Sequence, residues 1–184
     1  MKVHIPATIE DLYQVDGKAE LVDGEIVHMS PTGYWPARAG ARILFSLLGY
    51  EDQTQAGKAL PDNTGFVVYL PRRKTISPDV SFFAGPIPEG SNLCFVEGAP
   101  IFAVEVRSEG DYGPGAEKKM AAKRADYFTA GTQVVWDVDM LSEEVVRVYR
   151  AADPVAPTIY RRGEMAEAEP ALPGWKMPVD DLFR

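Results

Sequence analysis

The sequence contains little cysteine and little histidine. Cys94 is the only cysteine, and His4 and His28 are the only histidines among 184 residues. A single cysteine excludes an internal disulfide and a cysteine-based metal site. Two histidines are too few for a histidine-rich metal site. Disulfide-stapled scaffolds and zinc-finger-like domains are therefore excluded.

Long hydrophobic runs are also missing. No apolar segment is long enough to cross a bilayer, and the first residues, MKVHIPATIEDL, lack the apolar region of a signal peptide. The apolar share of 46% and the charged share of 25% are ordinary for a globular protein. We therefore expect a single domain over residues 1–184, located in the cytoplasm, with no membrane partner.

Basic charge is in deficit, because the formal net charge is −8. Basic residues cluster only at 71–74, 117–124 and 160–162. Proteins that grip nucleic-acid phosphates usually present a basic face. The balance counts against tight non-specific DNA binding, although local patches or metal ions can offset it.

Helical periodicity is present in three segments. The first, 8–15, is short and has Thr8 as its expected N-cap. The segment 36–50 begins with a proline suited to a first turn, and its apolar residues recur at helical spacing: Ala39, Ile43, Leu44, Leu47 and Leu48. The third helix is expected at about 115–129 and ends before Gly131.

Strands are expected in most of the remaining chain. An N-terminal β-hairpin is predicted around Asp23-Gly24, a dipeptide suited to a type I′ turn. The other expected elements are short strands at about 53–57, 65–70, 79–84 and 101–107, a Gly- and Pro-rich loop at 86–99, a hairpin formed by 132–139 and 143–150, and a tail at 171–183 that packs onto the core. Strands on both sides of the last helix predict an α/β fold, a mixed β-sheet flanked by helices.

Two carboxylates stand in segments that otherwise predict buried strands. Asp79 begins the apolar segment PDVSFF, and Glu105 lies inside FAVEVRS, where it shares one strand face with Arg107. Isolated buried carboxylates are costly unless a cation meets them. If the two strands are neighbours, Asp79 and Glu105 converge on one point, and paired carboxylate oxygens are suitable ligands for Mg²⁺.

Two further charged residues belong to this group. Glu20 lies in the early hairpin, with Leu21 and Val22 after it. Lys123 lies on the helical stripe that should face the core, together with Ala116, Met120 and Tyr127. A lysine on a buried stripe either reaches the helix edge or meets an anion, and the carboxylates of the preceding strands would be that anion.

The ordered motifs resemble a known family. The chain contains, in the family's order, YQVDGKAELVDGEIVHMSPTG, DNTGFVVY, SPDVSFF, FAVEVRSEGD, KRADYFTAGTQVVWDVD and VVRVYR. This order is typical of the Uma-two (Uma2) family of restriction-endonuclease-like proteins, in the PD-(D/E)xK nuclease superfamily. The resemblance extends from about residue 8 to the C-terminal LPGWKMPVDDLF. It implies a restriction-endonuclease-like fold and hydrolysis of DNA with Mg²⁺ as cofactor and Mn²⁺ as an alternative.

The resemblance also implies roles for individual residues. Asp79 and Glu105 correspond to the metal-binding pair, and Glu20 to an additional acidic residue that helps hold the metal. The superfamily usually has a lysine two residues after the second acid, whereas this chain has Arg107 there, and Lys123 resembles its substitute. Arginine suits phosphate binding but cannot act as a general base. The candidate catalytic residues are therefore Glu20, Asp79, Glu105, Arg107 and Lys123.

Each of these residues also has a simpler structural interpretation. Asp79 can cap a turn, Glu105 can face water on an edge strand, and Glu20 can be an exposed strand residue. Lys123 can extend to the helix edge, and Arg107 can be a structural partner of neighbouring residues.

Three functions stay open on the sequence alone. The first is a Mg²⁺-dependent endonuclease acting on DNA, for which cutting both strands calls for a homodimer. The second is a non-catalytic nucleic-acid or protein-binding module that retains the acidic pocket. The third is a metal-dependent hydrolase of small phosphorylated compounds, which suits the negative net charge better than DNA does.

Overall fold

A six-stranded sheet forms the centre of the computed structural model, which describes residues 5–87 and 93–184. Its strand order is β11-β10-β9-β8-β6-β3. Along the chain these strands are β3 (Lys58–Leu60), β6 (Val80–Phe83), β8 (Phe102–Val106), β9 (Val134–Val138), β10 (Val146–Arg150) and β11 (Asp153–Tyr160). β8 and β9 are parallel, and the other pairs are antiparallel. The expected mixed sheet is therefore confirmed.

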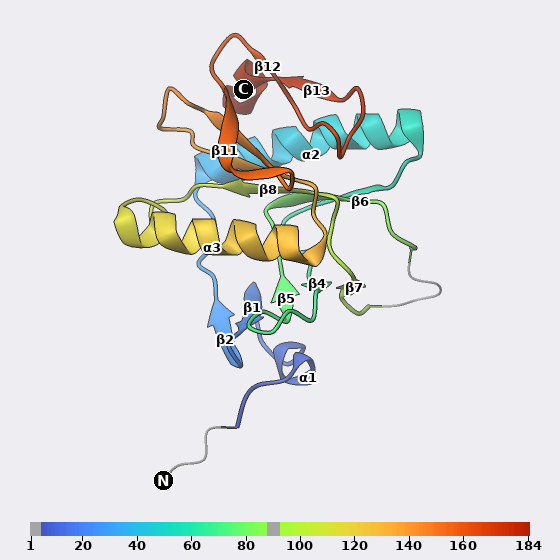
Figure 1. Ribbon diagram of the computed structural model, residues 1–184, viewed down its shortest axis with the longest axis vertical. Helices are drawn as coiled ribbons and strands as arrows, with labels where there is room; N and C mark the ends of the chain where they lie inside the picture. Colours follow the sequence, from blue (N-terminus) through green and yellow to red (C-terminus); the bar gives the residue numbers. More distant parts are fainter. Residues whose placement is uncertain (1–4, 88–92) are drawn as a thin grey trace.

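Two long helices cover the two faces of this sheet (Figure 1). α2 (Tyr34–Thr54) contributes Ala39, Ile43 and Leu47 to the larger apolar cluster. α3 (Pro114–Ala130) connects the parallel strands β8 and β9 and places Tyr127 in the smaller cluster. Because side chains alternate along a strand, Phe102, Val104 and Val106 face α2, whereas Ala103 and Glu105 face α3.

An antiparallel hairpin precedes α2, as expected. β1 (Ala19–Val22) pairs with β2 (Glu25–His28). Asp23 and Gly24 have φ values of 52° and 76°, which suit the type I′ turn. Gly24 is also required sterically, since a Cβ there would lie 2.9 Å from the Cβ of Pro6. The short helix α1 (Ile9–Leu12) begins at Thr8, whose side chain caps it.

The hairpin is joined to the segment that leads into β5. Val22 forms an isolated bridge with Arg73, and the Leu21 amide donates to Thr75 Oγ1 at 2.9 Å. This segment belongs to a small three-stranded sheet in the order β5-β4-β7, made of Thr75–Ile76, Phe66–Val67 and Val96–Glu97. These contacts fix the hairpin beside α3, so that it forms one wall of the site described below.

The C-terminal tail closes the larger apolar cluster, as expected. It contains β13 (Lys176–Pro178), which pairs with β12 (Met165–Glu167), and the short helix η1 (Val179–Phe183). The Trp175 ring packs against Phe102 and Trp136 at centroid distances of 5.6 and 5.1 Å. The Trp175 indole N–H donates to Ser46 Oγ of α2 at 3.1 Å, so the tail fixes α2 to the sheet.

Several boundaries differ from the sequence-based expectations. The strand expected at 53–57 is wrong, because α2 continues to Thr54 and ends at Gln55, which has a left-handed φ of 53°. Leu48 is 42% exposed, although its spacing predicted burial. A two-residue strand, Val96–Glu97, interrupts the loop expected at 86–99, of which residues 88–92 lie outside the described part.

The strand β11 was not predicted. It contains Pro154 and Pro157, which argue against a central strand, and most of its residues are exposed. β11 pairs only with β10 and lies at the edge of the sheet, where a missing N–H costs no ladder hydrogen bond. Within residues 5–87 and 93–184, no helix has both the length and the apolar character needed to span a membrane.

Trp175 should contribute strongly to stability. Trp175→Ala removes a side chain that is 5% exposed and leaves a cavity against Phe102 and Trp136, so the free energy of unfolding should fall by about 3–5 kcal/mol. The matched control is Trp35→Ala, since Trp35 is 54% exposed, and its effect should stay within about 0.5 kcal/mol. Urea denaturation followed by circular dichroism measures both, and equal losses would contradict the packing of the tail.

Candidate active site

The sheet register brings Asp79 and Glu105 to the same face. β6 and β8 are antiparallel neighbours in which Val80 pairs with Val104. One step further along this register, Asp79 lies opposite Glu105. The Asp79 amide donates to the Val104 carbonyl at 3.0 Å, and Asp79 Oδ2 accepts from the Val106 amide at 2.8 Å. The backbone of β8 therefore holds the Asp79 carboxylate next to Glu105.

Glu20 reaches the same place from the hairpin strand β1. Its carboxylate is buried and forms an ion pair with Arg73. Glu20 Oε1 accepts from the Ser77 amide at 2.9 Å and lies 3.2 Å from the Lys123 ammonium. Glu20 is therefore not an exposed strand residue, and both of its oxygens already have partners within the protein.

α3 supplies a cation and a hydroxyl to this cluster. Lys123 Nζ lies 2.9 Å from a Glu105 oxygen, and Tyr127, one turn further along α3, donates its hydroxyl hydrogen bond to the same carboxylate. Glu105 lies on a central strand and not at a sheet edge. The stripe that sequence analysis assigned to the core therefore brings Lys123 directly onto the carboxylates.

Lys18 completes the cluster and was not predicted from the sequence. Its ammonium lies 3.0 Å from Asp79 Oδ1 and 2.6 Å from Asp62 Oδ1. The signal that could have revealed it is the alternation of the first hairpin strand. Lys18 and Glu20 are two residues apart and hence share one face.

These side chains line one cavity of about 850 Å³ between the hairpin, the strand ends and α3. Glu20, Asp79, Glu105, Lys18 and Lys123 all contribute to its wall. The complete lining contains seven basic and seven acidic residues. In a chain with a net charge of −8 this balance is a local exception, and the cavity is therefore less repulsive to an anion than the protein as a whole.

The electrostatics fix the protonation of the α3 side chains. Burial disfavours the charged Lys123, but the attraction of Glu105 and Glu20 outweighs it and places the pKa of Lys123 above its ordinary value. Burial, reinforced by the negative Glu105, raises the pKa of Tyr127 well above its ordinary value. Burial also raises the pKa of Glu105, and the attraction of Lys123 opposes this rise. Lys123 therefore stays an ammonium and Tyr127 a neutral donor.

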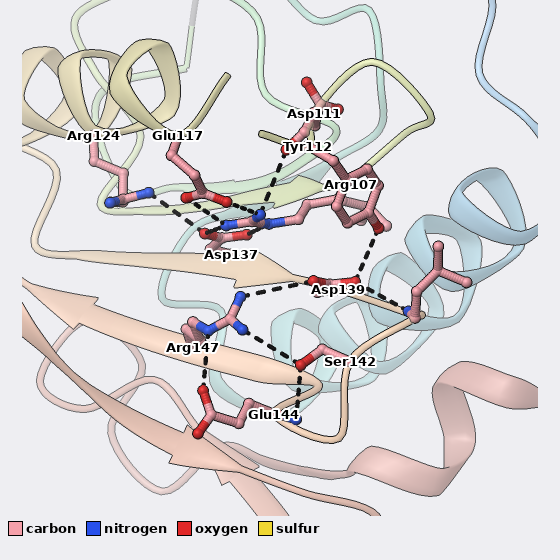
Figure 2. A network of polar contacts seen from close by, with 12 residues as sticks. Arg107, Asp111, Tyr112, Glu117, Arg124, Asp137, Asp139, Ser142, Glu144 and Arg147 are labelled. Carbon is pink, nitrogen blue, oxygen red and sulfur yellow. Dashed lines mark hydrogen bonds and ion pairs between the residues drawn. The ribbon is translucent and has the colours of Figure 1, made fainter. Parts of the chain in front are cut away.

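Arg107 lines the cavity wall, but its guanidinium points into a separate network (Figure 2). It forms a bidentate pair with the buried Asp137 at 2.7 and 2.8 Å, and both terminal nitrogens contact Glu117 of α3. A further bond reaches the Asp111 carbonyl at 3.5 Å. All five N–H donors are thus engaged, and of the two interpretations of Arg107 these contacts favour the structural one.

The network around Arg107 also includes Arg124, which neighbours Lys123 on α3. Arg124 lies 3.4 Å from Asp137 and packs over the Tyr149 ring, with its guanidinium carbon 4.0 Å from the ring centroid. Figure 2 shows Glu117 reaching from α3 to the Arg107 guanidinium and Arg124 reaching from α3 to Asp137 on the strand below. The network therefore fastens α3 to the sheet next to the residue that contacts Glu105.

The carboxylate pair is compatible with a hard divalent cation, and the expected role of Glu20 as a further metal ligand stays a prediction. As placed, no three His, Cys, Asp or Glu side chains within residues 5–87 and 93–184 form a group that could hold a metal ion. Glu20 is directed to Arg73, Ser77 and Lys123 instead. Asp79 and Glu105 lie together on the cavity wall, and Mg²⁺ commonly takes one or two carboxylates and completes its shell with water and phosphate oxygens.

Comparison with known proteins agrees with this architecture. The sequence model of the family Uma2, described as "Putative restriction endonuclease", matches residues 6–180. A crystal structure titled as a "putative nuclease belonging to DUF820" from Anabaena variabilis is similar, with a TM-score of 0.75, 18% identity, and coverage of 97% of this chain and 98% of that one. The search of curated proteins gave no match. The expected restriction-endonuclease-like fold is thereby confirmed.

The Arg107 network should be sensitive to the loss of its buried member. Asp137→Asn keeps the side-chain shape but leaves two guanidinium groups partly uncompensated at a site that is 1% exposed, so unfolding should become easier by about 3–5 kcal/mol. Glu117→Gln is the control, because this partner of the same guanidinium is 50% exposed and should cost at most about 1 kcal/mol. Urea denaturation compares the two, and similar costs would show that Asp137 is not the anchor.

Proposed function

The chain belongs to the Uma2 family, and from this premise we propose that it is a metal-dependent endonuclease that hydrolyses phosphodiester bonds of DNA. The observation that carries the proposal is the convergence of Asp79 and Glu105 from adjacent strands on one cavity that also contains the Lys123 ammonium. A carboxylate pair beside a fixed cation suits phosphoryl chemistry, in which negative charge must be held and offset.

Asp79 and Glu105 would hold the metal, Mg²⁺ or alternatively Mn²⁺. When bound, such an ion polarises the phosphate and lowers the pKa of a water molecule that attacks it. Asp79 is preorganised for this role, because the Val106 amide fixes its Oδ2. Glu20 would act indirectly, since its Oε1 lies 3.2 Å from the Lys123 ammonium and helps to hold it beside Glu105.

Lys123 would stabilise negative charge that develops on the phosphate. Its raised pKa keeps it protonated at neutral pH, so it cannot act as a general base. Tyr127 fixes Glu105 by a hydrogen bond and thereby orients the carboxylate beside Lys123. Arg107 would contribute by holding α3 in position, because its donors are already engaged.

Lys119 and Arg72 suit contacts with the DNA backbone. Both line the cavity and both are exposed. Arg72 pairs with Asp23 at the surface, and such exposed pairs are weak enough to exchange partners. Because the whole chain is acidic, DNA affinity should be low and strongly salt-dependent. A homodimer belongs to the same proposal, since cutting both strands requires two sites.

Small phosphorylated compounds are a second candidate substrate class. The cavity volume of about 850 Å³ falls within the roughly 300–1,000 Å³ typical of small-ligand pockets. Its balanced lining would admit an anion without a long basic surface. Screening nucleotides and sugar phosphates with Mg²⁺ and Mn²⁺ separates this activity from DNA cleavage.

Two substitutions should separate metal binding from the chemical step. Glu105→Gln removes one strong ligand oxygen, so metal affinity should fall and plasmid nicking should drop by about two orders of magnitude or more. Lys123→Ala should leave metal binding largely intact while slowing cleavage by about 10²–10³-fold. Supercoiled-plasmid nicking and metal titration are measured together at one divalent concentration.

The control for these variants is Glu143→Gln, which makes the same chemical change at an exposed residue outside the cavity lining. It should nick like the wild type. Equal nicking by the wild type and Glu105→Gln would indicate a contaminating nuclease or another site and would favour the non-catalytic binding module.

Divalent metal should also stabilise the native state. Because the ion binds the folded protein preferentially, millimolar Mg²⁺ or Mn²⁺ should raise the melting temperature in proportion to the logarithm of its concentration. Asp79→Asn should reduce this response, whereas Asp181→Asn, at a residue outside the cavity lining, should not. Thermal melts across a divalent titration test this, and curves that do not move for the wild type would count against a metal site.

A further inference from the structure

Lys18 lies where an external cation would otherwise meet Asp79. Asp79 Oδ2 is committed to the Val106 amide, which leaves Oδ1 as the oxygen available to a cation. The Lys18 ammonium lies 3.0 Å from this oxygen, and its side chain is only 15% exposed. The protein thus already supplies a positive charge at the carboxylate pair.

The second partner of Lys18 lies at the rim. Asp62 Oδ1 is 2.6 Å from the ammonium, and the Asp62 side chain is 45% exposed and outside the cavity lining. Lys123 differs in this respect, because both of its carboxylate partners, Glu20 and Glu105, line the cavity. Lys18 can therefore leave Asp79 for a partner at the rim, whereas the partners of Lys123 both hold it inside the cavity.

We propose that Lys18 is a resident counter-cation that a divalent metal ion displaces from Asp79, and that Asp62 retains the ammonium after displacement. This inference rests on the proposed metal-dependent function. Two cations at one carboxylate oxygen repel each other, so the ammonium and the metal compete for Asp79. The competition makes metal affinity lower than the carboxylate pair alone would give.

The resident ammonium groups also explain why the carboxylate pair is stable when no metal ion is bound. Asp79 and Glu105 lie opposite one another on adjacent strands, and two largely buried carboxylates without cations would be costly. Lys18 and Lys123 provide one ammonium for each. When metal enters, Lys18 moves its charge outward to Asp62, so the cavity does not accumulate a surplus of positive charge.

The first test measures Mn²⁺ affinity by electron paramagnetic resonance of the free ion, on full-length protein. Lys18→Met should bind Mn²⁺ roughly tenfold or more tightly than the wild type. Lys118→Met removes the same charge from an exposed position of α3 outside the cavity lining, and at physiological salt it should change affinity by less than about twofold. Lys18→Gln repeats the measurement if the methionine variant does not fold.

The second test uses Asp62 to separate exchange from general electrostatics. Asp62→Asn removes the alternative partner, so Lys18 should remain on Asp79 and Mn²⁺ should bind more weakly. In the Lys18→Met background, Asp62→Asn should have no further effect, because Asp62 acts through Lys18. A purely electrostatic contribution of Asp62 would persist in the double variant and would overturn the exchange.

The outcomes distinguish the two levels of the proposal. If the wild type binds Mn²⁺ and Lys18→Met binds it equally or more weakly, Lys18 is not a competitor and only this inference fails. If neither the wild type nor Lys18→Met binds Mn²⁺, the metal-dependent function fails and the inference fails with it. Binding by Lys18→Met alone would support both.

Discussion

The rest of the structure depends on the neutralisation of three carboxylates on one face of the sheet. Three carboxylates are buried or largely buried, and each pairs with a cation from a different part of the chain. Glu20 pairs with Arg73, Asp79 with Lys18, and Glu105 with Lys123. Charges in such surroundings are tolerated only with well-placed partners. The hairpin, the segment before β5 and α3 are therefore bound together by ionic contacts, and the cavity is the space that these three elements enclose.

The two faces of the sheet are stabilised in different ways. The α2 face is apolar, with Phe102, Trp136 and Trp175 in mutual ring contact. The α3 face is apolar only beneath Tyr127 and becomes ionic toward the strand ends. The Arg107–Asp137 pair lies next to Glu105 in the register of β8 and β9 and fastens α3 there. The apolar face thus contributes the larger core cluster, whereas the opposite face carries the charged residues that line the cavity.

The sequence predicts this structure where local periodicity determines it. Thr8, Asp23-Gly24 and Gly131 mark a helix start, a turn and a helix end in both the prediction and the structure. The strand β11 was not predicted because its prolines are compatible only with an edge strand. Whether a strand lies at the edge depends on the order of the whole sheet, which the local sequence does not indicate. The role of Lys18 was not predicted because its partners Asp62 and Asp79 are 44 and 61 residues away in the sequence. A local sequence pattern does not indicate such a long-range contact.

Arg107 and Lys123 show why motif spacing and spatial position must be distinguished. A residue two places after Glu105 shares its strand face, but it lies about 7 Å further along the strand. Its guanidinium is directed to Asp137, which lies beside Glu105 on β9, and to Glu117 in the first turn of α3, and not to Asp79 on the other side of Glu105. A lysine from the middle of α3 reaches Glu105 directly, at 2.9 Å. The ammonium beside the acidic pair is thus supplied by the helix, and the strand position is free to hold that helix in place.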